Sequence, residues 1–143
     1  MKKLEWSPNF EIGSEEIDDD HRRLVGLVQD IHEAIEKNDL MLCVGLANKF
    51  LGELSDHFDR EEALLERVGY PNTEGHKKYH ASLLAEAREL KRLCSEKDGV
   101  EKLGECYAAM VAVLVDDIIR GDSMFKSYLE HSGHRAPRKP KDR

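Results

Sequence analysis

The segment from His57 to His80, HFDREEALLERVGYPNTEGHKKYH, constrains the fold more than any other part of the chain. His57 and Glu61 are four residues apart, and so are His76 and His80. Residues four apart on an α-helix lie on one face, one turn above the other. Between the pairs, residues 69–73 (GYPNT) place a Gly suited to end one helix before Asn and Thr suited to cap the next. The segment therefore predicts a helical hairpin that carries two pairs of metal-ligating side chains.

Hydrophobic periodicity extends this hairpin into a larger helical fold. Apolar residues recur at helical spacing over residues 18–37, 39–68, 73–96 and 100–130. The first 18 residues lack this periodicity, and we interpret them as an extended N-terminal arm whose aromatic residues pack on the helices. Four helices with short connections predict an all-α fold, an up-down-up-down antiparallel four-helix bundle.

Length and charge limit the domain organisation and the possible partners. With 143 residues, the chain is long enough for one domain, which we place at residues 1–131, followed by a basic tail at 132–143 that we expect to be disordered. The formal charge of −7 argues against binding to nucleic acid or to a membrane surface. The longest apolar run, residues 107–115, is too short to cross a bilayer, and the N-terminal region contains no apolar segment typical of a signal peptide. These features predict a cytoplasmic protein.

The antiparallel arrangement brings polar residues of all four helices to one end of the bundle. The first and third helices begin where the second and fourth end, so His21 and the two ligand pairs should meet Asp117 and Asp122. A buried carboxylate without a partner costs several kcal/mol, and a pair of divalent cations would compensate for all of these groups together. The alternative is a bundle whose core histidines are incidental. We favour the metal centre because the whole set converges.

The remaining histidines and the cysteines are expected to lie outside this centre. Three turns of helix separate His32 from His21, and His131 and His134 lie at or beyond the end of the last helix. We interpret all three as surface residues. Three cysteines without the close spacing of zinc or redox motifs are expected to be reduced; they are Cys43, Cys94 and Cys106.

The combined pattern resembles the hemerythrin family, particularly its single-domain bacterial members. The resemblance rests on His21 with Leu24 three residues later, the motifs His57-Phe58-x-x-Glu61 and His76-x-x-x-His80, and a final Asp122. The opening EWSPNFEIGSEEIDDDH also resembles the first segment of the family, so the likeness covers about residues 4–130. It implies a non-haem centre of two iron ions with an oxo or hydroxo bridge, and dioxygen or peroxide as the small ligand.

The resemblance also implies the role of each ligand. It assigns His76 and His80 to one iron, His21 and His57 to the other, and Glu61 and Asp122 to the bridging positions. The family has a further histidine in a His-Ile-x-x-x-Asp motif, and this chain has Asp117 there. We favour Asp117 as a seventh ligand over a site that lacks one. An additional anion favours the ferric state, so oxidation should be easier.

Dioxygen, by the same resemblance, would bind at the less-ligated iron in an apolar, water-excluding pocket. The candidate walls, which could equally be ordinary core residues, are Leu24, Phe58, Leu114 and Ile118. The chain is therefore expected to be an oxygen-binding protein (a carrier, scavenger or sensor) rather than an enzyme. Two alternatives stay open: an oxidase or peroxidase-like di-iron enzyme, and a module that senses iron or redox state.

Overall fold

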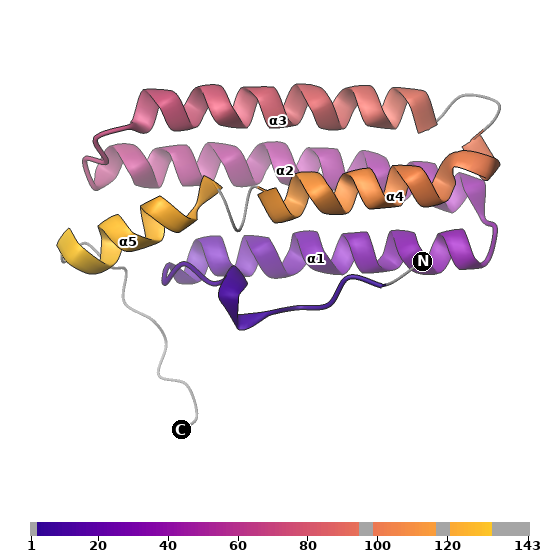
Figure 1. Ribbon diagram of the computed structural model, residues 1–143, viewed down its shortest axis with the longest axis horizontal. Coiled ribbons are helices and arrows are strands. Elements are labelled where there is room, and N and C mark those ends of the chain that lie inside the picture. The colour runs from indigo at the N-terminus through magenta and orange to yellow at the C-terminus, as the bar shows by residue number, and fades with distance from the viewer. Residues whose placement is uncertain (1–2, 95–98, 117–120, 133–143) are drawn as a thin grey trace.

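The computed structural model describes residues 3–94, 99–116 and 121–132 (Figure 1). Every regular element in those ranges is helical. In chain order they are a short 3-10 helix η1 (Pro8–Phe10), α1 (Glu15–Glu36), α2 (Leu40–Arg67), α3 (Thr73–Cys94), α4 (Gly99–Val115) and α5 (Ser123–Ser132). The predicted all-α class is confirmed.

The first four α-helices lie side by side along the long axis of the molecule (Figure 1). Contacts join α1 to α2, α2 to α3, α3 to α4 and α4 back to α1, so the helices form a closed ring. Each reverses the direction of the one before it, and α5 continues beyond the end of α4 (Figure 1). The antiparallel bundle predicted from the sequence is therefore confirmed.

The turns of the bundle follow from local sequence. After α1, Asn38 adopts a positive φ of 55°, a conformation that Asn tolerates better than most residues. The carboxylate of Asp39 then caps α2 by accepting a hydrogen bond from the Leu42 N–H (3.1 Å). At the other end of α2, Gly69 has φ of 70° and the Tyr70 N–H bonds back to the Leu65 carbonyl (2.9 Å). Helix α2 thus ends just before the GYPNT segment and α3 begins at its last residue, as the sequence predicted.

The fourth expected helix, residues 100–130, is divided into α4 and α5, so the prediction of one uninterrupted helix is wrong. Near this division, the Tyr79 hydroxyl of α3 donates a hydrogen bond to the Asp116 carbonyl (3.1 Å). A side chain therefore satisfies a backbone carbonyl at the end of α4. The ring of Tyr79 also lies against Gly121, where an added Cβ would be 2.6 Å from its Cε2 atom. Hydrophobic periodicity alone could not reveal this contact.

Replacing Gly121 by alanine should destabilise the protein by about 1–3 kcal/mol, because the new methyl group would overlap the hydrogen-bonded Tyr79 ring. Chemical denaturation measures the effect. Gly104→Ala is the matched control, since an added Cβ there meets nothing within 4 Å; it should stabilise α4 by about 0.5–1 kcal/mol. Equal stability of the two variants would show that the Tyr79 contact does not constrain the chain, whereas Tyr79→Ala should relieve the defect in Gly121→Ala.

Two apolar clusters flank a polar layer in the bundle. Along α2, Phe50 and Leu54 belong to the larger cluster, whereas Leu64 and Leu65 belong to a smaller one with residues of α5. His57 and Glu61 lie between these two sets in the helix, and both are fully buried. The polar layer is therefore closed from water at both ends by packed side chains.

The N-terminal arm packs along the bundle as expected. The Tyr107 hydroxyl accepts a hydrogen bond from the Leu4 N–H (2.7 Å), and the Gln29 side chain donates to the Leu4 carbonyl (2.9 Å). Nearer to α1, the Trp6 ring makes an edge contact with Phe10 and lies 5.1 Å from the Arg22 guanidinium carbon. The arm is thus fixed to α1 and α4 by both polar and aromatic contacts.

Two secondary expectations need correction. His32 is buried rather than exposed, and its ring packs edge-on against Tyr107 with centroids 5.2 Å apart. Cys106 is disulfide-bonded rather than reduced, whereas Cys43 is a free, buried thiol. His131 is exposed as predicted. None of the described helices combines the length and hydropathy that a membrane crossing requires.

Candidate metal centre

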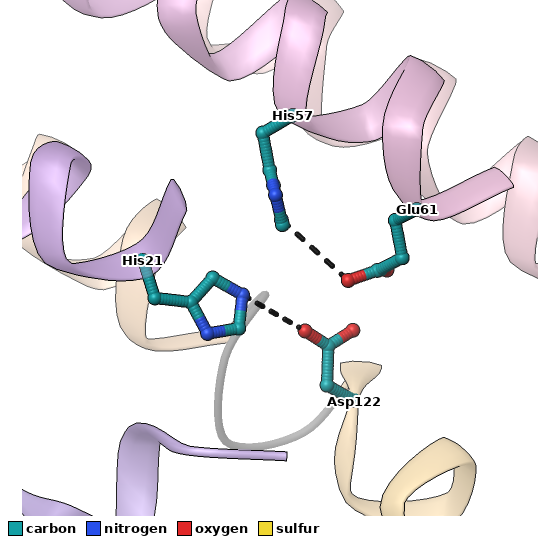
Figure 2. Close-up of side chains that lie close together, drawn as sticks. All are labelled: His21, His57, Glu61 and Asp122. Atoms are coloured by element: carbon teal, nitrogen blue, oxygen red, sulfur yellow. Dashed lines mark ion pairs between the residues drawn. The ribbon is translucent and has the colours of Figure 1, made fainter. Parts of the chain in front are cut away.

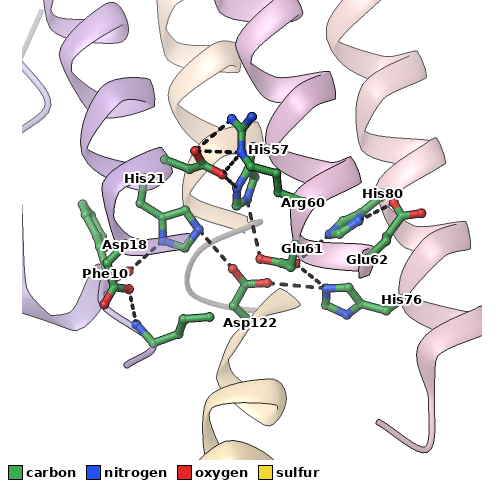
Figure 3. Close-up of polar contacts among 12 residues, drawn as sticks. Phe10, Asp18, His21, His57, Arg60, Glu61, Glu62, His76, His80 and Asp122 are labelled. Atoms are coloured by element: carbon green, nitrogen blue, oxygen red, sulfur yellow. Dashed lines mark hydrogen bonds and ion pairs between the residues drawn. The ribbon is translucent and has the colours of Figure 1, made fainter. Parts of the chain in front are cut away.

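Six of the seven predicted ligands meet in the polar layer (Figures 2 and 3). All six side chains are buried; they are His21 of α1, His57 and Glu61 of α2, His76 and His80 of α3, and Asp122 just before α5. The seventh, Asp117, lies outside the described residues. Antiparallel packing therefore produces the convergence that the sequence predicted.

The six side chains form two adjoining groups that share both carboxylates. One group combines His21 and His57 with Glu61 and Asp122, and the other combines His76 and His80 with the same two carboxylates. Within each group, one ligand atom of every residue lies within 4.8 Å of the others. Two cations could thus bind side by side, each between two imidazoles and two shared carboxylates.

The inner nitrogens of the histidines face these carboxylates. His21 Nε2 is 3.2 Å from Asp122 Oδ2, and His57 Nε2 is 3.6 Å from Glu61 Oε2 (Figure 2). In the second group, Glu61 Oε1 lies 2.8 Å from His76 Nε2 and 2.9 Å from His80 Nε2 (Figure 3). His76 Nε2 is also 3.5 Å from Asp122 Oδ1. All four rings therefore direct the same nitrogen towards the centre.

The outer nitrogen of His21 is fixed by the N-terminal arm. The Nδ1–H of His21 donates to the Phe10 carbonyl (2.9 Å), and because a carbonyl can only accept, Nδ1 must carry the proton. The Asp18 carboxylate holds the turn of the arm by accepting from the N–H groups of Ile12 (2.7 Å) and Gly13 (3.3 Å). A neutral His21 ring consequently presents the lone pair of Nε2 to the centre.

Carboxylates hold the outer nitrogens of two further rings. His57 Nδ1 is 3.1 Å from Asp20 Oδ2, and His80 Nδ1 is 2.9 Å from Glu62 Oε2. Outer partners of this kind orient metal-binding histidines and increase their basicity. Sequence reasoning missed Asp20 and Glu62, since each is one more acidic residue beside a predicted ligand and no spacing rule separates them from exposed neighbours.

The electrostatics of the centre favour ionised carboxylates. Burial raises the pKa of Glu61, but hydrogen bonds from His76 and His80 outweigh it and hold the pKa well below its usual value. Burial lowers the pKa of His76, yet its contacts with Asp122 and Glu61 raise it to about 9. The pKa of Asp20 falls to about 2, because His57 and Arg60 outweigh the effect of its burial. Without metal, a protonated His76 partly neutralises the carboxylates.

This donor set fits a pair of transition-metal ions. Imidazole nitrogens and carboxylate oxygens together suit divalent iron, manganese or zinc. Two metal ions would also replace the proton on His76 as the compensating positive charge in a layer that excludes water. The mixture of imidazoles and carboxylates, the sharing of Glu61 and Asp122, and the inward orientation of the four rings all fit a pair of metal ions.

Three of the four predicted oxygen-pocket residues lie in the larger apolar cluster. Leu24, Phe58 and Leu114 are buried there, and Phe58 stacks on the His80 ring with centroids 4.0 Å apart. Ile118 lies outside the described residues. A separate cavity of about 460 Å³ borders the centre at His76, and polar and apolar groups contribute about equally to its lining. The oxygen pocket thus stays a prediction, while the cavity offers one approach to a predicted ligand.

This chain is similar to known proteins that are named as hemerythrins. The family model for the hemerythrin HHE cation binding domain matches residues 12–121. A bacteriohemerythrin of Pseudomonas aeruginosa is 27% identical over 89 residues, which cover 62% of this chain and 58% of that protein, so the match spans less than two thirds of its length. A bacteriohemerythrin of Ralstonia nicotianae is 25% identical with 93% of each chain covered. A myohemerythrin of Theromyzon tessulatum is 26% identical over 66% of this chain and 73% of its own.

Proposed function

The chain belongs to the hemerythrin family, and on that premise we propose that it holds a non-haem di-iron centre that binds dioxygen. In this proposal His76 and His80 bind one iron, and His21 and His57 bind the other. The two shared carboxylates, Glu61 and Asp122, would be available to both. The observation that carries the proposal is the sharing itself, since two adjoining four-residue groups with common carboxylates match the needs of a metal pair.

The protein contributes orientation, charge and exclusion of water to this centre. When bound, a ferrous pair supplies the two electrons that dioxygen binding requires. The Phe10 carbonyl, Asp20 and Glu62 hold three imidazole rings with Nε2 directed inwards. The apolar clusters on either side of the polar layer keep water away, which strengthens the electrostatic interactions within it.

We further propose Asp117 as a seventh ligand, on the basis of its position in the sequence five residues before Asp122. A bound ferrous pair would bring +4, the two shared carboxylates −2 and a hydroxide ligand −1. Asp117 would reduce the sum from +1 to zero. A less positive centre stabilises the ferric state, so oxidation should be easier than in a centre with a neutral histidine there. The same extra carboxylate favours an oxidase or peroxidase-like enzyme as the second candidate function.

Visible absorption of the iron-loaded protein tests the proposal. The protein is loaded anaerobically with Fe(II), its iron content is measured, and spectra are recorded before oxygen, after oxygen and after oxygen removal. We expect two irons per chain and a charge-transfer band that forms with oxygen and disappears on its removal. Direct conversion to a stable diferric spectrum would instead support the second candidate function, an oxidase or peroxidase-like enzyme. Failure to bind two irons would contradict both functions.

A further inference from the structure

Asp20 is a buried acidic residue beside the centre that is not itself one of the proposed metal ligands. It precedes His21 on α1, and only 1% of its side chain is exposed. Its neighbour Asp19, by contrast, has a side chain that is 50% exposed and pairs with Arg22 (3.1 Å). Burial of a carboxylate is costly unless its oxygens are well satisfied. The burial of Asp20 therefore requires compensating contacts, whereas Asp19 remains hydrated.

Both oxygens of Asp20 are held by side chains of α2. Oδ2 is 3.1 Å from His57 Nδ1 and 2.9 Å from Arg60 Nε. Oδ1 accepts from Arg60 Nε (3.1 Å) and Nη2 (2.9 Å), and Arg23 contacts the same oxygen. This two-pronged guanidinium contact fixes the plane of the carboxylate. One oxygen of a rigidly held anion is thereby directed at the outer nitrogen of a predicted ligand.

An ordinary surface ion pair would not require this placement. The side chains of Arg60 and Arg23 are 37% and 51% exposed, so a carboxylate could pair with them in contact with water. Asp20 instead lies inside them and reaches His57, whose ring is fully buried. The arginines offset the charge from outside, and the carboxylate faces inwards. The buried position of Asp20 is needed for its contact with His57, whereas pairing with the arginines does not require it.

The partners of the other rings show what is particular to Asp20. His21 Nδ1 donates to a neutral backbone carbonyl, and the carboxylate beside His80, that of Glu62, has a side chain that is 23% exposed. His57 alone among these three rings has a fully buried anionic partner. A charged acceptor in a water-excluded setting increases the basicity of a ligating imidazole more than a neutral or solvated one does.

We propose that Asp20, held by Arg60, is a positioning residue for the metal site of His21 and His57: it fixes the His57 ring with Nε2 directed inwards and strengthens that nitrogen as a donor. The inference rests on the proposed iron centre and deepens it. It makes the two iron positions unequal, because the carboxylate described beside His80, that of Glu62, is partly exposed, whereas Asp20 is buried. Asp20 joins α1 to α2, the two helices that supply the histidines of the same iron.

An anaerobic Fe(II) competition titration of three proteins tests the inference: the wild type, Asp20→Asn and Asp19→Asn. Both variants remove one negative charge from adjacent positions, but only Asp20 contacts His57. Asp20→Asn should weaken one of the two iron positions by about 10- to 100-fold, the usual effect of losing an outer partner, and leave the other unchanged. Asp19→Asn should match the wild type. The visible spectrum of the oxygenated centre should shift in Asp20→Asn alone.

A measurement on the metal-free wild type keeps the test valid if Asp20→Asn folds poorly. Nitrogen-15 NMR of the histidine rings should show a proton on Nδ1 of His57 that exchanges slowly with water, because Asp20 holds it in a buried site. A His57 ring without a proton on Nδ1 would overturn the inference. So would equal iron affinities in the wild type and Asp20→Asn. A wild type that binds no iron pair would overturn the proposed function and this inference with it.

Discussion

Replacement of Glu61 by alanine should abolish binding of the metal pair and leave at most one iron per chain. Glu61 belongs to both four-residue groups, and its two oxygens face His57, His76 and His80. Its loss therefore removes a donor from each metal position at once. The decrease in affinity should exceed the roughly 10- to 100-fold that loss of an outer partner costs. Iron content after anaerobic loading and desalting measures it.

Asp59→Ala is the matched control for this variant. Asp59 is on the same helix and carries the same charge, but its side chain is exposed. It should retain two irons per chain. The more conservative Glu61→Gln keeps the shape of the side chain and loses only its charge, so it should also fail to hold the pair. Two irons per chain in Glu61→Ala would exclude a bridging role for this residue.

Metal affinity should rise about tenfold per pH unit up to about pH 9 and then level off. The pKa of His76 is raised to about 9 in the metal-free protein, so below that pH a metal ion must displace a proton to reach Nε2. Competition titrations with Fe(II) at a series of pH values measure this slope. His131→Ala should leave it unchanged, because His131 is exposed and belongs to neither group of predicted ligands. A pH-independent affinity would mean that His76 releases no proton.

The metal-free protein should show the opposite trend in stability. The folded-state pKa of His76 lies above its ordinary value of 6.5. Its pairing with Glu61 and Asp122 therefore contributes fully below about pH 6.5 and is lost as the pH rises through about 9. Denaturation of the metal-free protein should accordingly show falling stability across this window, while metal affinity increases. A flat or rising profile would contradict the charge state proposed for His76.

The sequence predicted the convergence of six side chains well because its signals are local and periodic. The His57–Glu61 and His76–His80 spacings each span one helical turn, and the GYPNT turn sets the two helices antiparallel. Given a bundle, these facts place the ligands at one level. Periodicity also located α1, α2 and α3 to within a few residues.

The features that the sequence did not reveal depend on contacts between distant segments. A backbone carbonyl such as that of Phe10 has no sequence signature, and Asp20 looks like one more acid in the first turns of α1, where the helix dipole alone would explain it. The division between α4 and α5 involves packing of Tyr79 from another helix. The sequence predicted a surface position for His32, but the bundle buries it against Tyr107.

The distribution of the ligands along the chain has a consequence for the order of assembly. Glu61, His76 and His80 all lie within one hairpin, which can close early because its loop is short. The other half of the centre must bring His21 together with Asp122 from opposite ends of the chain. We therefore expect an unfinished chain to capture its first ion in the α2–α3 hairpin, and the second only when the last helix docks. The centre would then be loaded in the order in which the protein folds.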